Sequence, residues 1–214
     1  MSDELFRWGW VVDNLDEVAA RSWEHLTLTL IAVGIGLMIS LPVGVYCHRH
    51  RRAYGPVATT AGILYTIPSL ALFAMLVPFT GLTTTTAEIG LVSYTLLILI
   101  RNIVAGLRAV PEDAKEAALG MGYSRRELLW RVELPLALPV VVAGVRIATV
   151  TVIGLVTVTS LIGLGGLGHF ILLGLDRFFS TATILGSVLS VVLAICADRL
   201  LALVERLLTP WARA

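Results

Sequence analysis

Long stretches with few or no charged residues alternate with short polar segments along the chain. A helix needs about 20 apolar residues to cross a bilayer, and five stretches provide that length. The predicted spans are residues 26–47, 57–79, 89–107, 137–162 and 181–204. The second is placed inside a longer uncharged stretch that contains three prolines and cannot be one straight helix. The pattern therefore predicts an all-α fold with about five transmembrane helices.

Composition excludes an ordinary water-soluble domain. Hydrophobic residues make up 57% of the 214 residues and charged residues only 14%, which is more apolar surface than a soluble fold of this size can bury. The formal net charge is +1, so the chain has no overall field that would attract nucleic acid. We expect a polytopic membrane protein whose surroundings are the lipid bilayer, with no nucleic-acid partner.

Arginines and lysines are unevenly divided between the two sides that the spans define. Most of them follow the first, third and fifth spans, on one side: Arg49, Arg51, Arg52, Arg108, Lys115, Arg125, Arg126, Arg131, Arg206 and Arg213. The other side has three arginines and, near the N-terminus, six acidic residues. Because cytoplasmic flanks carry the excess of arginine and lysine, we expect the N-terminus outside and the C-terminus inside.

The N-terminal segment, residues 1–24, contains Trp8, Trp10 and Trp23. Such amphipathic rings favour the depth of the lipid headgroups, so we expect a short helix lying on the external surface. The predicted membrane domain is residues 25–208, and the predicted cytoplasmic tail is residues 209–214.

The longest predicted cytoplasmic loop, residues 111–135, has the signals of two short helices. Pro111 followed by two acidic residues suits a first helical turn, and Gly122 is a natural left-handed stop. Ser124 stands three residues before Glu127, the spacing of a capping box, so a second helix begins at once. We expect it to end before Pro135 and to meet the first helix at an angle.

This loop resembles the cytoplasmic signature of ABC importer permeases, which reads Glu-Ala-Ala, three residues, Gly, nine residues, Ile, one residue and Leu-Pro. The residues in that register here are Glu116, Ala117, Ala118, Gly122, Val132, Leu134 and Pro135, with valine in place of isoleucine. The resemblance implies a type I ABC importer permease fold. It also implies that the loop forms the coupling helix, which docks into a groove of the ATPase subunit.

Over residues 26–208 the chain most resembles osmoprotectant permeases, which import glycine betaine, choline or carnitine. The segments that carry this narrower resemblance are residues 65–72, 99–102, 132–139 and 161–168. Permeases for methionine and other amino acids have similar size and span patterns, so an amino-acid importer is the alternative within the family.

The family resemblance implies the remaining parts of the machine and a bacterial cytoplasmic membrane. These are two ATPase subunits, which hold ATP and Mg, and an external substrate-binding protein. Five spans leave no closed pore, so a second permease copy or a paralogue is also expected. The chain has no glycine-rich loop ending in Lys-Ser or Lys-Thr, no clustered metal ligands and no catalytic set. We therefore expect a transport subunit that is not an enzyme and binds no cofactor or metal.

Three charged residues fall within predicted spans, where a charge is costly unless it faces protein or water. Arg101, Arg146 and Asp198 all map to the cytoplasmic third of their spans. We predict that Asp198 pairs with Arg146 or Arg101. A structural ion pair, or arginines that snorkel to the interface, explains these residues as well as a role in transport does.

Other polar and aromatic residues in the spans are candidates for the translocation pathway: Tyr65, Thr66, Pro68, Ser69, Tyr94 and Asn102. Pro68 frees a backbone carbonyl that needs another donor, and tyrosine ring faces can receive a quaternary ammonium. Packing is the alternative role of each aromatic ring. A glycine run after the fourth span is either a flexible outer gate or a tight turn: Gly163, Gly165, Gly166 and Gly168.

A channel or membrane scaffold that works without ATP is the alternative from another functional class. Such a protein would not need the register of residues 116–135. Co-purification with an ATPase separates the two hypotheses.

Overall fold

The computed structural model describes residues 5–213. The first four residues of the predicted external segment and the last residue of the predicted tail lie outside the described residues. Within residues 5–213 the chain forms helices and no strand.

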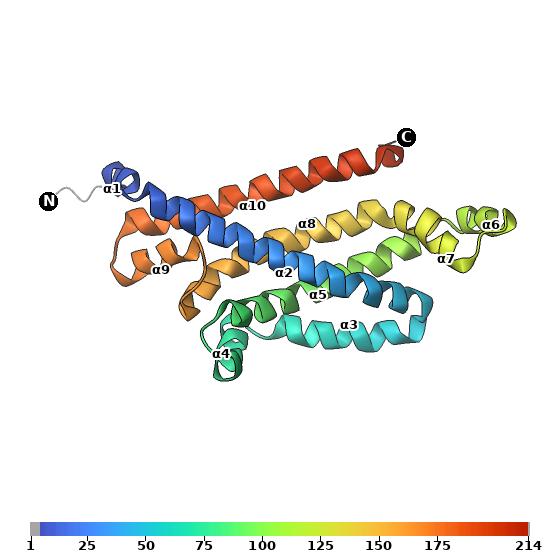
Figure 1. Cartoon of the computed structure of the whole chain (residues 1–214), viewed down its shortest axis with the longest axis horizontal. Coiled ribbons are helices and arrows are strands. Elements are labelled where there is room, and N and C mark those ends of the chain that lie inside the picture. Colours follow the sequence, from blue (N-terminus) through green and yellow to red (C-terminus); the bar gives the residue numbers. More distant parts are fainter. Residues whose placement is uncertain (1–4, 214) are drawn as a thin grey trace.

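Long helices make up most of the fold (Figure 1). Four are long and apolar enough to cross a membrane: α2 (Leu15–Arg49), α5 (Thr84–Ala109), α8 (Leu134–Val158, with the turns that flank it) and α10 (Ser180–Leu208). A fifth candidate span is a bent pair of helices, α3 (Arg51–Thr66) and α4 (Ser69–Thr80). Among the described residues this gives four spans, or five if the bent pair crosses as one.

Shorter elements join and cap the spans. The short α-helices are α1 (Trp8–Asp13), α6 (Glu112–Gly120), α7 (Arg125–Leu128) and α9 (Gly168–Asp176). A π-helix, η1 (Leu129–Glu133), lies between α7 and α8. Two 3-10 turns follow α8 and α10, namely η2 (Thr159–Ile162) and η3 (Pro210–Arg213).

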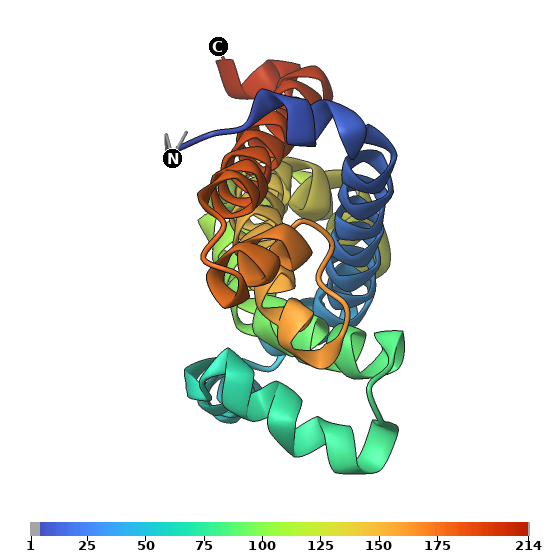
Figure 2. The same cartoon turned by 90° about the vertical axis from the view of Figure 1, so that its left-hand side faces the viewer.

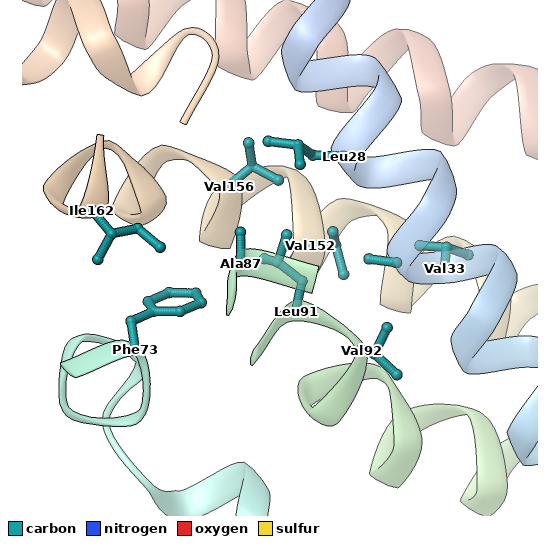
Figure 3. Packing of buried hydrophobic residues seen from close by; sticks show 10 residues of the cluster. Leu28, Val33, Phe73, Ala87, Leu91, Val92, Val152, Val156 and Ile162 are labelled. Carbon is teal, nitrogen blue, oxygen red and sulfur yellow. The ribbon is translucent and has the colours of Figure 1, made fainter. Parts of the chain in front are cut away.

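The core lies where α2, α5 and α8 pack together. Figure 3 shows one cluster, in which Leu28 and Val33 of α2 meet Leu91 of α5 and Val152 of α8. Phe73 of α4 adds its fully buried ring from the side. Because lipid is as apolar as these side chains, the gain comes from close packing and not from escape from water.

The outer helices cover this core unequally. α10 packs against α8 and α9 but leaves most of its surface exposed in the single chain, and α3 lies along α5. Figure 2 shows α3 and α4 projecting on the side of the bundle opposite α10. An apolar helix so exposed suits lipid or another membrane subunit.

The two ends of the bundle differ in what they carry. One end holds α6, α7, the corner between α2 and α3, and the C-terminus, while α1 and α9 lie at the other (Figure 1). The basic residues that the sequence groups on one side thus lie at the same end as the loop of α6 and α7.

Three element boundaries differ from the sequence prediction. Residues 15–24 are not a separate surface helix but the start of α2, because good helix formers with Asp16 and Glu17 in the first turn continue directly into the apolar stretch. The span at residues 57–79 is not one helix. Its two halves bend by 93° around Pro68, which lacks the N–H that would continue α3.

The third difference concerns the second helix of the long loop, which does not end before Pro135. It passes through the π-helix η1 into α8, and Pro135 sits in the first turn of α8. The changed hydrogen-bond spacing of the π-helix lets the chain absorb a residue without an N–H at that point.

Candidate coupling site and translocation pathway

The loop between α5 and α8 is held in shape by local hydrogen bonds. Where α6 ends, the Tyr123 N–H donates to the Ala118 carbonyl (3.1 Å) and the Gly122 N–H donates to the Leu119 carbonyl (2.9 Å). These two bonds form a Schellman motif, which requires a left-handed residue just beyond the helix end. Gly122 has φ +86°, so the predicted left-handed stop is present.

The predicted capping box then starts α7. The Glu127 N–H donates to the Ser124 hydroxyl (3.3 Å), and the Ser124 N–H donates to the Glu127 carboxylate (2.9 Å). Leu129, at the start of η1, is buried in a cluster with residues of α5 and α8. The second half of the loop is therefore anchored to the bundle, and the rigid turn at Gly122 positions α6 beyond it.

Glu116 and Ala117 are exposed on α6, whereas Ala118 is buried against the rest of the loop. Gly122 is also exposed, and a Cβ there would meet nothing within 4 Å. The remaining signature residues, Val132, Leu134 and Pro135, are partly buried in η1 and the first turn of α8. The signature thus extends from the exposed helix α6 to the second half of the loop, which is anchored to the bundle.

The break between α3 and α4 brings two of the pathway candidates together. The Tyr94 hydroxyl donates to the Ile67 carbonyl, so α5 supplies the donor that the break at Pro68 requires. The rings of Tyr65 and Tyr94 meet edge to face, with centroids 5.8 Å apart. Tyr94 is buried and Tyr65 is 38% exposed, so the more accessible ring is that of Tyr65.

The other pathway candidates do not join this pair. The Thr66 hydroxyl is exposed and donates to the Ile63 carbonyl, and Ser69 begins α4 beyond the break. Asn102 lies about 12 Å along α5 from Tyr94 and donates to the Ile98 carbonyl of its own helix. A side chain at Gly144 of α8 would collide with it. Asn102 is thus part of the α5 and α8 contact.

Asp198 pairs with Arg146 and not with Arg101. The Arg146 guanidinium donates from Nε (2.9 Å) and Nη2 (3.1 Å) to the two Asp198 oxygens, in the fork geometry that arginine favours with carboxylates. It also donates to Glu205, about two helical turns further along α10 (3.0 Å). Arg101 is exposed and has no ion pair among residues 5–213.

Comparison with known proteins decides the family. The family model of the binding-protein-dependent transport system inner membrane component matches residues 32–210. The chain belongs to this family of ABC importer permeases. It is 39% identical to the choline transport system permease protein of Bacillus subtilis, over 92% of this chain and 91% of the relative. It is 37% identical, over the same shares, to the glycine betaine/carnitine/choline transport system permease protein of that organism.

A solved structure of the methionine ABC transporter MetNI, in an inward-facing conformation, has the same fold. Its matching chain superposes with a TM-score of 0.83 at 25% identity, covering 92% of this permease and 98% of that chain. The protein is therefore a multi-pass permease subunit of the plasma membrane, and in this family the ATPase is a separate subunit.

Three of the four glycines in the run are tightly packed: a Cβ at Gly165, Gly166 or Gly168 would collide with neighbouring backbone, whereas one at Gly163 would meet nothing within 4 Å. Gly163 and Gly165 have positive φ, and a Cβ at Gly166 would collide with the backbone of His25 on α2. His25 is fully buried: its Nδ1 accepts from the Leu167 N–H (3.3 Å), so its Nε2 carries the proton donated to the Ile153 carbonyl (3.0 Å). These contacts hold the glycine run against α2 and α8.

Sequence reasoning missed three residues of the permease. His25 stands at the border of the first predicted span, and its buried role has no sequence signal because its partners are backbone groups distant in sequence. Glu205 repeats the position of Asp198 at a spacing of seven, which places both on one face of a helix. That spacing is a signal that could have identified it.

Glu88 is the third missed residue. Both of its carboxylate oxygens are buried in α5 without a hydrogen-bond partner among the described residues. The predicted third span begins one residue later and so leaves Glu88 outside it. The Thr83 side chain accepts from the Thr86 N–H, so α5 begins before the predicted span. The run of threonines could have indicated this earlier start.

Proposed function

We propose that this permease imports quaternary-ammonium osmoprotectants of the choline, glycine betaine and carnitine class. The observation that carries the import role is the exposed helix α6. The left-handed Gly122 and a complete capping box fix it on the part of the loop that is anchored in the bundle. This arrangement suits a helix that receives force from another protein. The substrate class is supported by the names of the choline and glycine betaine/carnitine/choline relatives.

The proposed machine contains two permeases, identical or paralogous, two ATPase subunits and an external substrate-binding protein. ATP and Mg are held by the ATPase subunits, and this chain holds no cofactor or metal and no ATPase motif. Closure of the ATPases draws the α6 helices together and moves the inner halves of the bundle as rigid bodies. The N-terminus lies outside and the loop of α6 and α7 lies in the cytoplasm.

Accessible aromatic rings support a cationic substrate. Tyr65 presents a partly exposed ring beside the break at Pro68, where a span changes direction. A quaternary ammonium has no N–H to donate in a hydrogen bond. The face of an aromatic ring attracts its positive charge without one. Backbone outside regular helix is tolerated at membrane depth where it lines a cavity or is buried in protein.

Substitutions in the exposed part of the coupling loop test the proposal. Gly122→Trp forces a bulky residue into the left-handed region, and Glu116→Ala removes an exposed carboxylate that can pair with a basic group of the ATPase. We expect both variants to insert normally, to lose recovery of the ATPase on a tagged permease, and to import labelled choline roughly tenfold more slowly.

Asp113→Ala is the matched control, because Asp113 is an exposed acid of the same helix outside the signature. It should leave uptake unchanged. Wild-type uptake and ATPase recovery in Gly122→Trp, at equal membrane abundance, would disprove the coupling role and favour a channel or scaffold. Uptake of methionine in place of choline or glycine betaine would reject the substrate class while leaving the coupling role intact.

A further inference from the structure

A basic cleft lies where α2 and α5 end, at the same end of the bundle as α6. Its volume is about 800 Å³, and five of its lining residues are arginine or lysine, against two glutamates. The basic residues come from four parts of the chain that the fold brings together: Arg49, Arg51, Arg108, Lys115 and Arg125. No stretch of sequence shows this cluster by itself.

Both glutamates of the cleft already have partners. Glu112 pairs with Lys115 (3.1 Å), and Glu133 pairs with the His48 ring (3.4 Å). The four arginines have no carboxylate partner among residues 5–213. Arg49 reaches only the Arg125 carbonyl (3.5 Å), and Arg108 stacks over the Tyr54 ring (4.7 Å). Such a cluster of like charges favours an anion, and the arginine fork fits phosphate oxygens well.

An apolar groove adjoins the basic cleft and shares Arg49 and His50 with it. Its volume is about 510 Å³, and its lining is made by the last turns of α2, by η1 and by the start of α8. Leu41, Val45 and Leu129 give it apolar walls. Trp130 and Tyr46 also line it and are 59% and 55% exposed, as suits aromatic residues at the edge of a bilayer.

We propose that the cleft and the groove together bind one anionic phospholipid. The phosphate lies among the arginines, and an acyl chain follows the groove along α2 toward the bilayer centre. Because α2 and α5 are membrane spans, their ends lie at the depth where lipid phosphates are concentrated. The apolar groove favours a lipid over free phosphate, which would use only the basic cleft.

The ATPase is a less suitable occupant of this site. The tip of the coupling loop, with Met121 70% exposed beside Gly122, offers an apolar docking surface. The cleft is lined by Glu112, Lys115 and Leu119 of α6, but its other residues lie at the base of the loop and at the corner of α2 and α3, where the spans end. A lipid bound there would hold α6 to the ends of α2 and α5, and so would set how firmly the coupling helix is attached to the membrane domain.

Two pairs of neighbouring arginines provide matched variants. Arg51 and Arg125 line the cleft, whereas Arg52 and Arg126 are exposed and do not. The double variant Arg51→Gln/Arg125→Gln therefore removes two positive charges from the site. The control Arg52→Gln/Arg126→Gln removes the same charges from adjacent positions. Native mass spectrometry of the whole chain, purified alone and with its ATPase, would measure retained phosphatidylglycerol against phosphatidylcholine.

We expect phosphatidylglycerol to bind the wild type and the control variant equally, and the cleft variant at least about tenfold more weakly. Phosphatidylcholine should bind poorly to all three. Equal retention of phosphatidylglycerol by the two double variants would overturn the proposal. So would displacement of the lipid by millimolar glycerol phosphate or inorganic phosphate, because the site would then take a soluble phosphate.

Tryptophan fluorescence tests the groove separately. Phosphatidylglycerol with brominated acyl chains should quench the part of the emission that is lost in Trp130→Phe, and brominated phosphatidylcholine should not. Absence of this difference would overturn the placement of the acyl chain in the groove. If the cleft variant keeps its lipid but loses the ATPase, the cleft is a protein docking surface and the proposal is wrong. Failure of choline uptake would leave each of these outcomes unchanged.

Discussion

Arg146 of α8 forms the ion pairs that join α8 to α10. Its single guanidinium serves both Asp198 and Glu205, and all three side chains are about a quarter to a third exposed in the single chain. At membrane depth a charge without a partner is costly, so the three groups stabilise one another mainly by avoiding that cost. Their partial exposure leaves water or a neighbouring subunit able to reach the cluster.

Removal of Arg146 should therefore harm the permease more than removal of one of its acids. Arg146→Gln removes the salt-bridge partner that Asp198 and Glu205 share, whereas Asp198→Asn leaves Arg146 paired with Glu205. We expect Arg146→Gln to lower the melting temperature in detergent by roughly 5 °C and Asp198→Asn by less.

The double variant separates the ion pair from other effects of these substitutions. If the pair is real, Arg146→Gln/Asp198→Asn should lose less than the sum of the two single losses. Thermal unfolding of all four proteins in one detergent gives the comparison. Strict additivity would show that the two side chains act independently.

At the scale of elements, the break between α3 and α4 depends on one hydroxyl from α5. The Ile67 carbonyl leaves regular helix at Pro68, and Tyr94 supplies its donor. Burying that carbonyl without a donor is expensive at membrane depth. The break is thus fixed by a residue 27 positions later in the chain.

Tyr94→Phe tests this dependence because it removes the hydroxyl and keeps the ring. We expect a loss of stability of about 1–2 kcal/mol, the cost of a partly buried acceptor left without a donor. Tyr65→Phe is the control, since it keeps the ring contact and the Tyr94 hydroxyl. The comparison is between denaturation midpoints in detergent. Equal midpoints for the two variants would contradict a structural role for the Tyr94 hydroxyl.

Elements defined by local chemistry were predictable from the sequence, and those defined by distant contacts were not. The left-handed Gly122 and the capping box at Ser124 depend on neighbouring residues, and both are present. The bend at Pro68 was not predicted, because one proline permits a bend but the packing of α4 on α5 determines its direction. The continuous helix through Pro135 depends on a π-helix for which we found no sequence signal.

The candidate site residues likewise divide into those that the sequence predicts and those that it does not. The signature residues could be found because their spacing alone identifies them, and the Arg146 pair because few charges lie within spans. The basic cleft could not be found, since its arginines come from the α2 and α3 corner, from α5 and from α7. The pathway candidates were grouped by residue type, and the structure separates Asn102 from the tyrosines.

At the scale of the whole molecule, the fold has two chemically different ends. The α2 and α3 corner, the coupling loop and the C-terminus share one end, and α1 and α9 lie at the other (Figure 1). Arginine and lysine are concentrated at the first end, which the positive-inside rule assigns to the cytoplasm. The same orientation is required if an ATPase is to reach α6.

Cysteine labelling tests this orientation directly. Cys47 is fully buried and can stay, while the exposed Cys196 is first replaced by alanine. Single cysteines are then placed at two exposed positions, Asp13→Cys at the α1 end and Arg52→Cys at the other end, outside the basic cleft. A membrane-impermeant maleimide added to intact spheroplasts should label Asp13→Cys and leave Arg52→Cys unlabelled until the membrane is permeabilised. Labelling of Arg52→Cys with protection of Asp13→Cys would reverse the orientation and place α6 where no cytoplasmic ATPase could bind it.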